Sequence, residues 1–522
     1  MTAEYDIAVV GSGFAGSLMA MIARKLGHSV VLLEKGKHPR FAIGESSTPL
    51  SNLLLETISE RYDLPLLKPL SKWGTWQRTY PDIACGMKRG FSFFHHELDS
   101  PLRTLDSDRQ LHVAASPNDL VADTHWYRSD FDHFLVRQAQ SVGVDYFDEV
   151  DIRRAGSVAA VWHLETTQAA QERTFHVRFL IDATGPRGFL HKVLGLSETP
   201  LPDFPLTSGL YSHFSGVGEL ATSYSLCTME TPYPVDASAV HHVFDGGWIW
   251  VLRFNNGITS AGVAATHQAT ERLCFERKED AWKELLDSLP LVKNQFANAQ
   301  VERPFTFARQ LSFRSSAIAG SNWALLPSAA GFVDPLLSTG FPLTLLGIRR
   351  LGEILDQHWG SPQMETSLQD YARQTDDELL ATARLIGALY RNMDDFPTFR
   401  CLSLLYFAAA SYAEVARRLN KPELARSFLL QDHPVFGPES RRLLTLAQGP
   451  MSATEKSRLT AEVYELIRDF DVAGLGKRPA NHSYPVDAAD LFAAAPKLGS
   501  SAGEIEALLQ RTGFYSAAHQ QS

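Results

Sequence analysis

The stretch Asp6-Ile7-Ala8-Val9-Val10-Gly11-Ser12-Gly13-Phe14-Ala15-Gly16 decides the fold class of this 522-residue chain. A short β-branched run passes directly into a Gly-x-Gly-x-x-Gly turn, and residues 17–26 then carry the apolar spacing of a helix. Residues 29–33 form a second buried strand, so the segment is a βαβ unit. Glycine at these positions permits a tight turn and lets the backbone approach a pyrophosphate at the helix N-terminus.

Glu34 supplies the second half of this signal, because it stands at the end of the second strand. A carboxylate there accepts hydrogen bonds from the hydroxyls of a ribose. A purely structural glycine-rich turn would leave Glu34 without a reason for its position. We therefore predict a dinucleotide site.

Two later segments select FAD rather than NAD as the dinucleotide. Residues 179–185 (Phe-Leu-Ile-Asp-Ala-Thr-Gly) are a buried strand that ends in small residues, where the backbone can pass close to adenosine. Residues 324–340 (Ala-Leu-Leu-Pro-Ser-Ala-Ala-Gly-Phe-Val-Asp-Pro-Leu-Leu-Ser-Thr-Gly) predict a strand, a small-residue loop and a helix start. The free N–H groups and dipole of that helix would stabilise negative charge on a reduced flavin.

The remaining chain divides by pattern. Residues 130–142 have helical spacing and end at Gly143, residues 199–313 alternate in short aromatic-rich segments, and the chain after Phe341 is strongly helical. The fold class is therefore α/β, with an inserted β-rich substrate domain and a C-terminal helical cap. The expected parts are a first FAD-binding part at 1–198, the substrate domain at 199–313, a closing FAD-binding segment at 314–350 and a helical domain at 351–522.

Composition excludes several other classes. The net charge is -10 and the chain has no Lys/Arg block, so we expect no nucleic-acid partner. The four cysteines, Cys85, Cys227, Cys274 and Cys401, are far apart, and adjacent histidine pairs point to opposite strand faces, so we expect neither disulfides nor a metal. No apolar run approaches the roughly 20 residues of a membrane span, and no leader peptide is visible, which favours a cytoplasmic protein.

In their order and spacing, the three glycine-bearing segments resemble the glutathione-reductase-like FAD fold of the para-hydroxybenzoate-hydroxylase type. Two further motifs match that superfamily. Gly44-Glu45-Ser46-Ser47-x-Pro49 is similar to its loop beside the flavin, and Arg128-Ser129-Asp130-Phe131-Asp132 is similar to its R-x-x-F-D helix start.

Within the superfamily, three features resemble the flavin-dependent, tryptophan-halogenase-like halogenases. Residues 85–93 are similar to the segment that carries the halogenases' essential lysine, which makes Lys88 the candidate. Gly247-Trp248-Ile249-Trp250 resembles the start of a W-x-W-x-I-P motif, and residues 332–340 resemble the F-x-x-P-x-x-S-x-G loop. The chain departs from the pattern at Val251-Leu252, where the family has Ile-Pro, and at Pro327-Ser328, where it has Gly-Asp.

The resemblance implies a mechanism. A separate flavin reductase supplies FADH2, oxygen forms a flavin C4a-hydroperoxide, and halide beside Ser338, Thr339 and Gly340 is oxidised to hypohalous acid. Lys88 then delivers electrophilic halogen to an aromatic or other electron-rich substrate, which is either free or tethered to a carrier protein. Asp334 orients the substrate or accepts the ring proton, and burial suits a lysine to its role because it lowers the lysine pKa.

The same resemblance implies the remaining site residues. Trp248 and Trp250 are expected at the substrate. The expected FAD-binding residues are Gly11, Gly13, Phe14, Ala15, Gly16, Glu34, Lys35, Ser46, Arg128, Asp182, Gly185, Ser328, Gly331, Pro335, Gly340 and Phe341.

Alternatives stay open at this point. Lys88 also fits a solvated cation on a hairpin, the two tryptophans fit core packing, and Asp334 fits an acceptor within its turn. A hydroxylating FAD monooxygenase would not need Lys88, a lipid saturase like the geranylgeranyl reductases would not need oxygen, and a non-catalytic flavin-binding protein is a further option. The sequence is compatible with a homodimer.

Overall fold

The structure, a computed structural model, describes residues 2–100, 106–223, 231–477 and 482–516, so the predicted free cysteine Cys227 lies outside the described residues. The predicted βαβ unit is present as β1 (Thr2–Val10), α1 (Phe14–Lys25) and β2 (Val30–Leu33). These strands pair in parallel, and β1 also pairs in parallel with β10 (Gln171–Asp182). Because β1 is central, the glycine turn after it opens at the carboxyl edge of the sheet.

The first sheet has eight strands, with the order β18-β19-β10-β1-β2-β7 and with β9 and β8 continuing from β10. Its other strands are β7 (Asp145–Phe147), β8 (Asp151–Val158), β9 (Val161–Gln168), β18 (Ala319–Gly320) and β19 (Trp323–Leu325). The strand predicted around residue 324 is thus an inner strand of the nucleotide-binding sheet, which brings residues 326–340 to the same edge as the glycine turn.

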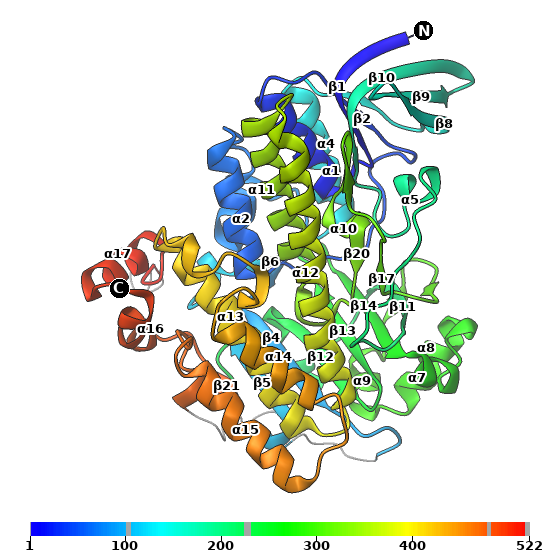
Figure 1. The fold of residues 1–522 in the computed structure, drawn as a ribbon. Coiled ribbons are helices and arrows are strands. Elements are labelled where there is room, and N and C mark those ends of the chain that lie inside the picture. The colour runs from blue at the N-terminus through cyan, green and yellow to red at the C-terminus, as the bar shows by residue number, and fades with distance from the viewer. Residues whose placement is uncertain (1, 101–105, 224–230, 478–481, 517–522) are drawn as a thin grey trace.

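A second sheet of nine strands lies below the first in the view of Figure 1, with the order β15-β11-β14-β13-β12-β4-β5-β21 and β16 beside β11. Its main strands are β4 (Gly90–His95), β5 (Gln110–Ala114), β11 (Thr207–Ser215), β12 (Ala239–Phe244), β13 (Gly247–Arg253) and β14 (Ile258–Thr266). The short strands β15 (Gln300–Val301), β16 (Thr306–Ala308) and β21 (Ser483–Tyr484) lie at its edges. The segment expected to form a substrate domain therefore shares its sheet with β4 and β5. This sharing follows from the parallel pairing of β12 with β4, which sequence alternation does not reveal.

Long helices cover both sheets. Helices α2 (Pro49–Arg61), α11 (Gly340–His358) and α12 (Gln363–Arg391) pack side by side, and α13 (Phe396–Arg418) crosses in front of β4 and β12 in Figure 1. The predicted helix at 130–142 is α4 (Arg128–Ser141). The described part of the C-terminal region continues with α14 (Phe436–Leu446), α15 (Ala453–Ile467), α16 (Ala488–Ala494) and α17 (Ala502–Arg511), as the helical-cap prediction requires.

A small antiparallel sheet joins the two halves of the molecule. It consists of β3 (Cys85–Lys88) and β6 (Asp123–Trp126), and its register places Lys88 directly opposite Asp123. The residues after β6 start α4, and the residues after β3 enter β4 of the second sheet. This junction therefore lies between the nucleotide-binding part and the substrate sheet.

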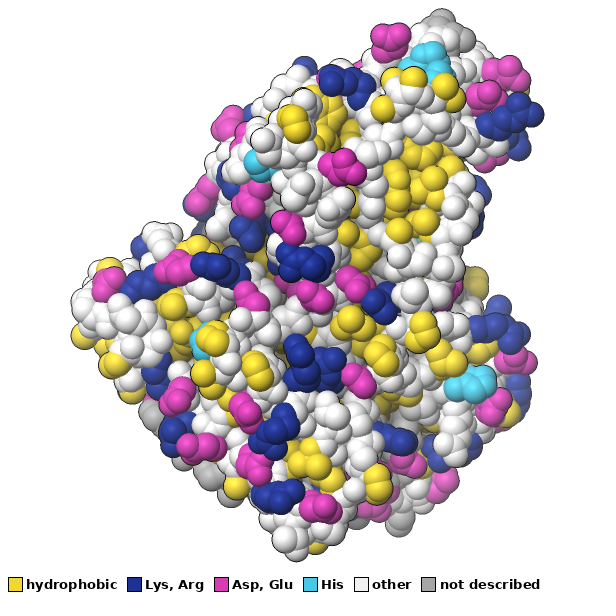
Figure 2. Space-filling view, in the orientation of Figure 1, with side chains coloured by type: hydrophobic (Ala, Val, Ile, Leu, Met, Phe, Trp, Pro, Cys, Tyr) yellow, Lys and Arg dark blue, Asp and Glu magenta, His cyan; other side chains and the backbone are white. Residues whose placement is uncertain are grey.

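The surface gives little functional information by comparison. Figure 2 shows basic and acidic side chains interspersed over one face, with hydrophobic side chains gathered above a notch at its right edge. Among the described helices, none has the length and apolarity that crossing a bilayer requires. Charge singles out no site on this face, and the chemically distinctive groups lie in the interior.

Candidate functional site

The glycine turn packs directly against the end of β10. Gly11 has a φ of +97°, and a Cβ added there would lie 2.8 Å from the backbone carbonyl of Ala183. A Cβ on Gly16 would collide with the carbonyl oxygen of Gly11. Only glycine fits both positions, while Phe14 and Ala15 open the buried helix α1. The turn is thus shaped as the motif predicts.

Glu34 is buried beside this turn. Its carboxylate accepts hydrogen bonds from the backbone N–H of Ser12 at 2.9 Å, the Ser12 hydroxyl at 2.8 Å and the backbone N–H of Gly36 at 2.8 Å. Burial alone raises the pKa of Glu34, but the Arg40 guanidinium and these donors outweigh burial and hold the pKa below its ordinary value. Glu34 therefore stays ionised and can accept further hydrogen bonds from ribose.

Two guanidinium groups face the glycine turn. A Cβ on Gly13 would lie 3.5 Å from Nη2 of Arg128 and 3.6 Å from Nη2 of Arg40. Arg128 also forms two hydrogen bonds with Asp132, at 2.7 and 2.8 Å, and donates to the carbonyl oxygen of Gly44 at 2.9 Å. Backbone N–H groups at a helix start with cations beside them suit a diphosphate, so these residues fit the pyrophosphate of FAD.

Asp182 and Lys35 lie differently from the other expected cofactor residues. Asp182 is buried and accepts hydrogen bonds from the N–H and hydroxyl of Thr184 and from the N–H of Leu190, so it shapes the loop that contains Gly185. The Lys35 side chain is exposed to solvent. Asp182 thus contributes to the cofactor site by holding the backbone of the loop that contains Gly185.

The third predicted segment forms α10 (Pro327–Ala330), a short loop and the start of α11. Pro327 occupies the first turn of α10, where a missing N–H costs nothing, and it packs on Gly347. Ser328 is half-buried in that turn, whereas Gly331 packs tightly against Leu379. The departure from Gly-Asp is therefore accommodated by α11 and α12.

The loop before α11 brings its halide candidates close to the helix N-terminus. Ser338 has a φ of +55° and Thr339 immediately precedes the first residue of α11, Gly340. A Cβ on Gly340 would meet only one ring atom of Phe332, at 3.8 Å. Together with the free N–H groups of a 19-residue helix, this open backbone suits an anion or a reduced flavin.

Phe341 continues the site from that helix, because its ring stacks on Trp126 at 4.4 Å and contacts Phe14 at 5.0 Å between ring centroids. The glycine turn, the strand before α4 and the start of α11 thereby share one aromatic cluster. Pro335 lies at the opposite end of the loop and is half-buried.

Lys88 is fully buried, which excludes the interpretation as a solvated cation. Its Nζ donates to the Ser46 hydroxyl at 2.9 Å and to the Ser47 carbonyl at 2.6 Å, and it lies 3.5 Å from the Ser338 hydroxyl. The same Nζ is 3.8 Å from the centroid of the Phe91 ring. Three predicted segments therefore meet at one ammonium group.

The pKa of Lys88 is lowered to about 7, because burial penalises its charge more than the opposite charge of Asp123 favours it. For Asp123, burial raises the pKa to about 7 against the opposing charge of Lys88. The two groups face each other across β3 and β6, so the charge state of each shifts the pKa of the other. A lysine in this state can act as a hydrogen-bond donor or as a neutral amine near neutral pH.

Asp334 lies at the other end of an aromatic column. Phe93 stacks on His241 at 4.5 Å, and His241 lies 5.2 Å from Trp248 between ring centroids. The Trp248 indole donates to Asp334 at 3.3 Å. The column thus links the phenylalanine five residues after Lys88 to the predicted carboxylate.

Asp334 itself accepts hydrogen bonds from the Tyr390 hydroxyl and from the backbone N–H of Leu336, both at 3.0 Å. It is therefore an acceptor within its own turn, as one interpretation expected, and also a link to α12.

Trp250 points to the same strand face as Trp248, but its indole donates to the Ser260 hydroxyl at 3.3 Å and its ring lies over Gly262.

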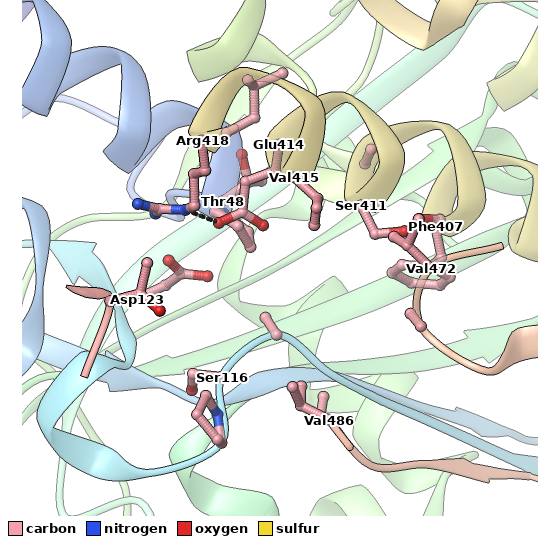
Figure 3. Close-up of a pocket in the computed structure, with 18 of the residues that line it drawn as sticks. Thr48, Ser116, Asp123, Phe407, Ser411, Glu414, Val415, Arg418, Val472 and Val486 are labelled. Carbon is pink, nitrogen blue, oxygen red and sulfur yellow. Dashed lines mark hydrogen bonds and ion pairs between the residues drawn. The ribbon is translucent and has the colours of Figure 1, made fainter. Parts of the chain in front are cut away.

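A cavity of about 170 Å³ lies between α13, the end of β5 and the start of β6. We call it the Asp123 cavity. Figure 3 shows the Asp123 carboxylate pointing into it, with Phe407, Ser411 and Glu414 of α13 on the opposite side. The Phe91 ring, which contacts the Lys88 ammonium, also lines the cavity. Of the predicted substrate residues, neither Trp248 nor Trp250 belongs to its described wall.

Sequence reasoning did not find Asp123, Asn52 or Glu414. Asp123 lies five residues before the Arg128 motif, at the start of a short strand, and only its pairing with β3 brings it to Lys88. Another omission is a buried pair in which His213 Nε2 lies 2.8 Å from Glu45 Oε1 of the predicted flavin loop. The sequence signal for this pair was the Gly-Glu-Ser motif itself, because the Glu45 carboxylate needs a partner when it is buried.

The family model for tryptophan halogenase matches residues 120–399, which is more than half of the chain. The chain belongs to the tryptophan halogenase family. A model for an NAD(P)-binding Rossmann-like domain also matches residues 9–52. These matches confirm the predicted family and the predicted nucleotide-binding fold of the N-terminal segment.

Two curated relatives show the extent of the similarity. The tetracycline 7-halogenase of Kitasatospora aureofaciens is 30% identical over 355 residues, which are 65% of this chain and 61% of the relative. The monodechloroaminopyrrolnitrin halogenase of Pseudomonas fluorescens is 27% identical over 404 residues, which are 75% of this chain and 69% of the relative. The chain thus spans about 60 to 70% of the length of these relatives.

The solved structures agree with the fold. The halogenase PltM in complex with phloroglucinol and FAD has a TM-score of 0.82 and 24% identity, with 92% of this chain and 99% of that chain covered. The flavin-dependent brominase Bmp2 has a TM-score of 0.61 and 20% identity, with 87% of this chain and 100% of that chain covered.

Proposed function

We propose that this protein is an FADH2- and O2-dependent halogenase that places halogen on an electron-rich aromatic compound bound in the Asp123 cavity. The observation that carries the proposal is the position of Lys88. Its buried ammonium contacts the Ser338 hydroxyl of the predicted halide loop on one side, and on the other side the ring of Phe91, which lines the cavity.

When FAD is bound in its reduced form, it would supply, with O2 and halide, the oxidised halogen as hypohalous acid. The residues that would hold FAD are the glycine turn, Glu34 at its ribose, Arg40 and Arg128 at its pyrophosphate, and the start of α11 at its isoalloxazine ring. The N–H groups of that helix and the Ser338 and Thr339 hydroxyls suit a halide ion. A separate flavin reductase would supply the reduced cofactor.

Lys88 transfers the electrophilic halogen to the substrate. Its ammonium donates a hydrogen bond to the oxygen of hypohalous acid, which makes the halogen more electrophilic, or its neutral amine carries the halogen as a haloamine. Ser46 and Ser47 hold the Nζ in place, and the apolar ring of Phe91 excludes water from it. Asp334 acts as a positioning residue, because it fixes the loop before Ser338 through the N–H of Leu336.

The cavity volume sets the size of the substrate. An apolar cavity of about 150 Å³ accommodates benzene, so about 170 Å³ suits a single aromatic ring with small substituents. Similarity to the 1H-pyrrole-2-carbonyl-[peptidyl-carrier protein] chlorinase of Pseudomonas fluorescens, which is 26% identical over 357 residues, leaves a carrier-tethered ring as the second substrate class. A free monocyclic substrate is the one that the described walls enclose.

The decisive experiment supplies FADH2 through a flavin reductase and measures product masses with chloride and then bromide. We expect a halide-dependent mass shift that Lys88→Ala abolishes while the flavin absorbance and FAD affinity of the variant stay unchanged. The control is Lys283→Ala, which removes an exposed lysine paired with Glu279 and should behave as the wild type. A product that gains oxygen without halide would establish a monooxygenase instead, and turnover without O2 would establish a saturase.

A further inference from the structure

The wall of the Asp123 cavity contains two buried hydrogen-bond acceptors that no described residue satisfies. Asp123 is 5% exposed, and its Oδ1 accepts from Nδ2 of Asn52 at 2.7 Å. Its Oδ2 is buried without a partner among the described residues, and so is Oδ1 of Asn52. Buried acceptors of this kind cost free energy unless a donor reaches them. The cavity is therefore built to receive a hydrogen-bond donor.

The cations of the described wall are already committed. Arg418 pairs with Glu414 at 2.7 Å and with Glu56 at 3.5 Å, and Lys72 lies 3.9 Å from Glu56. Figure 3 shows the Arg418–Glu414 pair beside the open carboxylate of Asp123. A substrate carboxylate would find no unpaired cation here and would face two carboxylates. This wall favours a neutral donor on an aromatic ring.

We propose that Asp123 selects a phenolic substrate by accepting the hydrogen bond of its ring hydroxyl at Oδ2, and that it then takes the hydroxyl proton. The inference rests on the proposed halogenase function and adds the substrate class and a catalytic residue. The bulk of the remaining wall is apolar, with Phe91 and Phe407 positioned to contact a ring. Lys88 stands opposite Asp123 in the sheet and contacts Phe91 of the cavity wall, so the acceptor that would anchor the ring lies beside the residue proposed to deliver halogen.

The proton and electron balance is simple. The O–H bond of the phenol breaks, its electron pair stays on oxygen and its proton moves to Asp123. The electron-rich phenolate ring then attacks the halogen of hypohalous acid, whose hydroxide leaves. The ring carbon loses its proton to that hydroxide, which gives water, and Asp123 returns its proton to the product oxygen.

The surroundings of Asp123 suit it to this role. Burial raises its pKa to about 7 against the opposing charge of Lys88, and a carboxylate with a raised pKa is a stronger base toward a phenol. Glu414 raises the pKa further, while the Asn52 hydrogen bond and Lys72 lower it. The charged and titratable groups that face Asp123 from the elements around it are Lys88, Lys72, Glu414, Arg418 and Tyr406, and Glu56 pairs with Lys72 and Arg418 behind them.

The test compares Asp123→Asn with Asp119→Asn, an equivalent change at a half-exposed aspartate that pairs with Arg89 outside the cavity wall. The probes are resorcinol and its dimethyl ether, with methionine present to scavenge hypohalous acid that leaves the protein. We expect the wild type and Asp119→Asn to halogenate resorcinol at least 100-fold faster than the ether. Asp123→Asn should lose at least 100-fold in kcat/KM on resorcinol and bind it at least tenfold more weakly by calorimetry, with binding of the ether unchanged.

A second variant, Glu414→Gln, keeps Asp123 and tests the same role through pH. Removing this like charge should move the acid limb of the kcat/KM profile for resorcinol to lower pH. Equal resorcinol rates in Asp123→Asn and the wild type, an equal rate of the wild type on the ether, or an unmoved limb in Glu414→Gln would overturn the proposal. Failure of the halogenase function itself is separate, because the methionine trap would then reveal no oxidised halogen in any variant.

Discussion

Asp334 is a carboxylic acid that the folded chain holds away from water. Burial raises its pKa from 3.8 to about 7, although the N–H of Leu336, the Tyr390 hydroxyl and the Trp248 indole all lower it. A carboxyl group whose pKa is raised on folding contributes its full stability below its unfolded pKa, near 4, and loses that contribution as the pH rises through about 7. Ionisation of Asp334 therefore lowers the stability of the folded chain.

This charge can be removed without removing the side chain. Asp334→Asn keeps an oxygen that can accept from Leu336 and Trp248 but cannot ionise. We expect the melting temperature of the variant relative to the wild type to increase between pH 5 and pH 8, as the wild type bears a growing cost of ionisation. Asp63→Asn, an exposed change, should show a constant difference. A difference between Asp334→Asn and the wild type that does not change with pH would contradict the buried-acid assignment.

Residue types predicted parts of the site but not its contacts. Lys88 and Asp334 stood out because their neighbours carry recognisable spacing, and the structure links them through the rings of Phe91, His241 and Trp248. Tyr390 did not stand out, because it lies 56 residues after its partner in a long apolar helix pattern. A hydroxyl on such a helix gives no sequence signal until the helix is docked.

At the scale of elements, local patterns predicted what is local. The βαβ unit, α4 and the strand before α10 follow from periodicity, turn glycines and β-branched runs. The β3–β6 pair does not, because a shift of one residue in its register would place Lys88 and Asp123 on opposite faces of the pair. The recruitment of β4 and β5 into the substrate sheet depends likewise on pairing between strands far apart in sequence.

Helices α11 and α12 are joined by a buried ion pair. The Arg350 guanidinium donates to both oxygens of Glu378, one at 2.7 Å, and Glu378 also accepts from the N–H of Phe428 at 2.8 Å. Both charged groups are almost fully buried, at 9 and 2% side-chain exposure. The pair therefore fixes how α12 and the segment around residue 428 dock on the helix that carries the start of the flavin site.

Removing one partner of this pair should lower the free energy of unfolding far more than replacing both partners. Arg350→Met leaves the Glu378 carboxylate buried without its cation, and we expect a loss of about 3–5 kcal/mol in the free energy of unfolding. The double variant Arg350→Met/Glu378→Leu should recover most of that loss, because no buried charge is left. Urea denaturation measures the free energy of unfolding of both variants. A double variant as unstable as the single one would show that the ion pair stabilises the fold beyond neutralising its own two buried charges.

At the scale of the whole molecule, a group of neutral buried histidines lies in the substrate sheet, just after β4, and in the adjoining strand β6. Burial lowers the pKa of His112, His241 and His242 to about 3, and it holds the pKa of His96 and His125 well below the ordinary value. His96 and His242 share a hydrogen bond of 3.0 Å between their rings, so at least one of them must be neutral there to accept it. The adjacent pairs of the sequence thus serve the core.

These histidines make the fold sensitive to acid. In the unfolded chain His112, His241 and His242 would each bind a proton near pH 6.5, whereas in the folded chain they do so only near pH 3, so their contribution to stability is complete above about pH 6.5 and falls as the pH drops toward 3. Each such group accounts for up to about 1.4 kcal/mol per pH unit in that window. We expect the urea midpoint to fall steeply between pH 6.5 and 5.

His241→Phe isolates one member of the group. A phenylalanine keeps the ring contacts with Phe93 and Trp248 and cannot take up a proton. Its unfolding free energy should fall less steeply with acid than that of the wild type, by up to about 1.4 kcal/mol per pH unit, and acid unfolding should take up one proton fewer. A wild-type midpoint that stays level from pH 6.5 to 5, or a variant with the same slope, would mean that the sheet admits water to these rings and that they titrate normally.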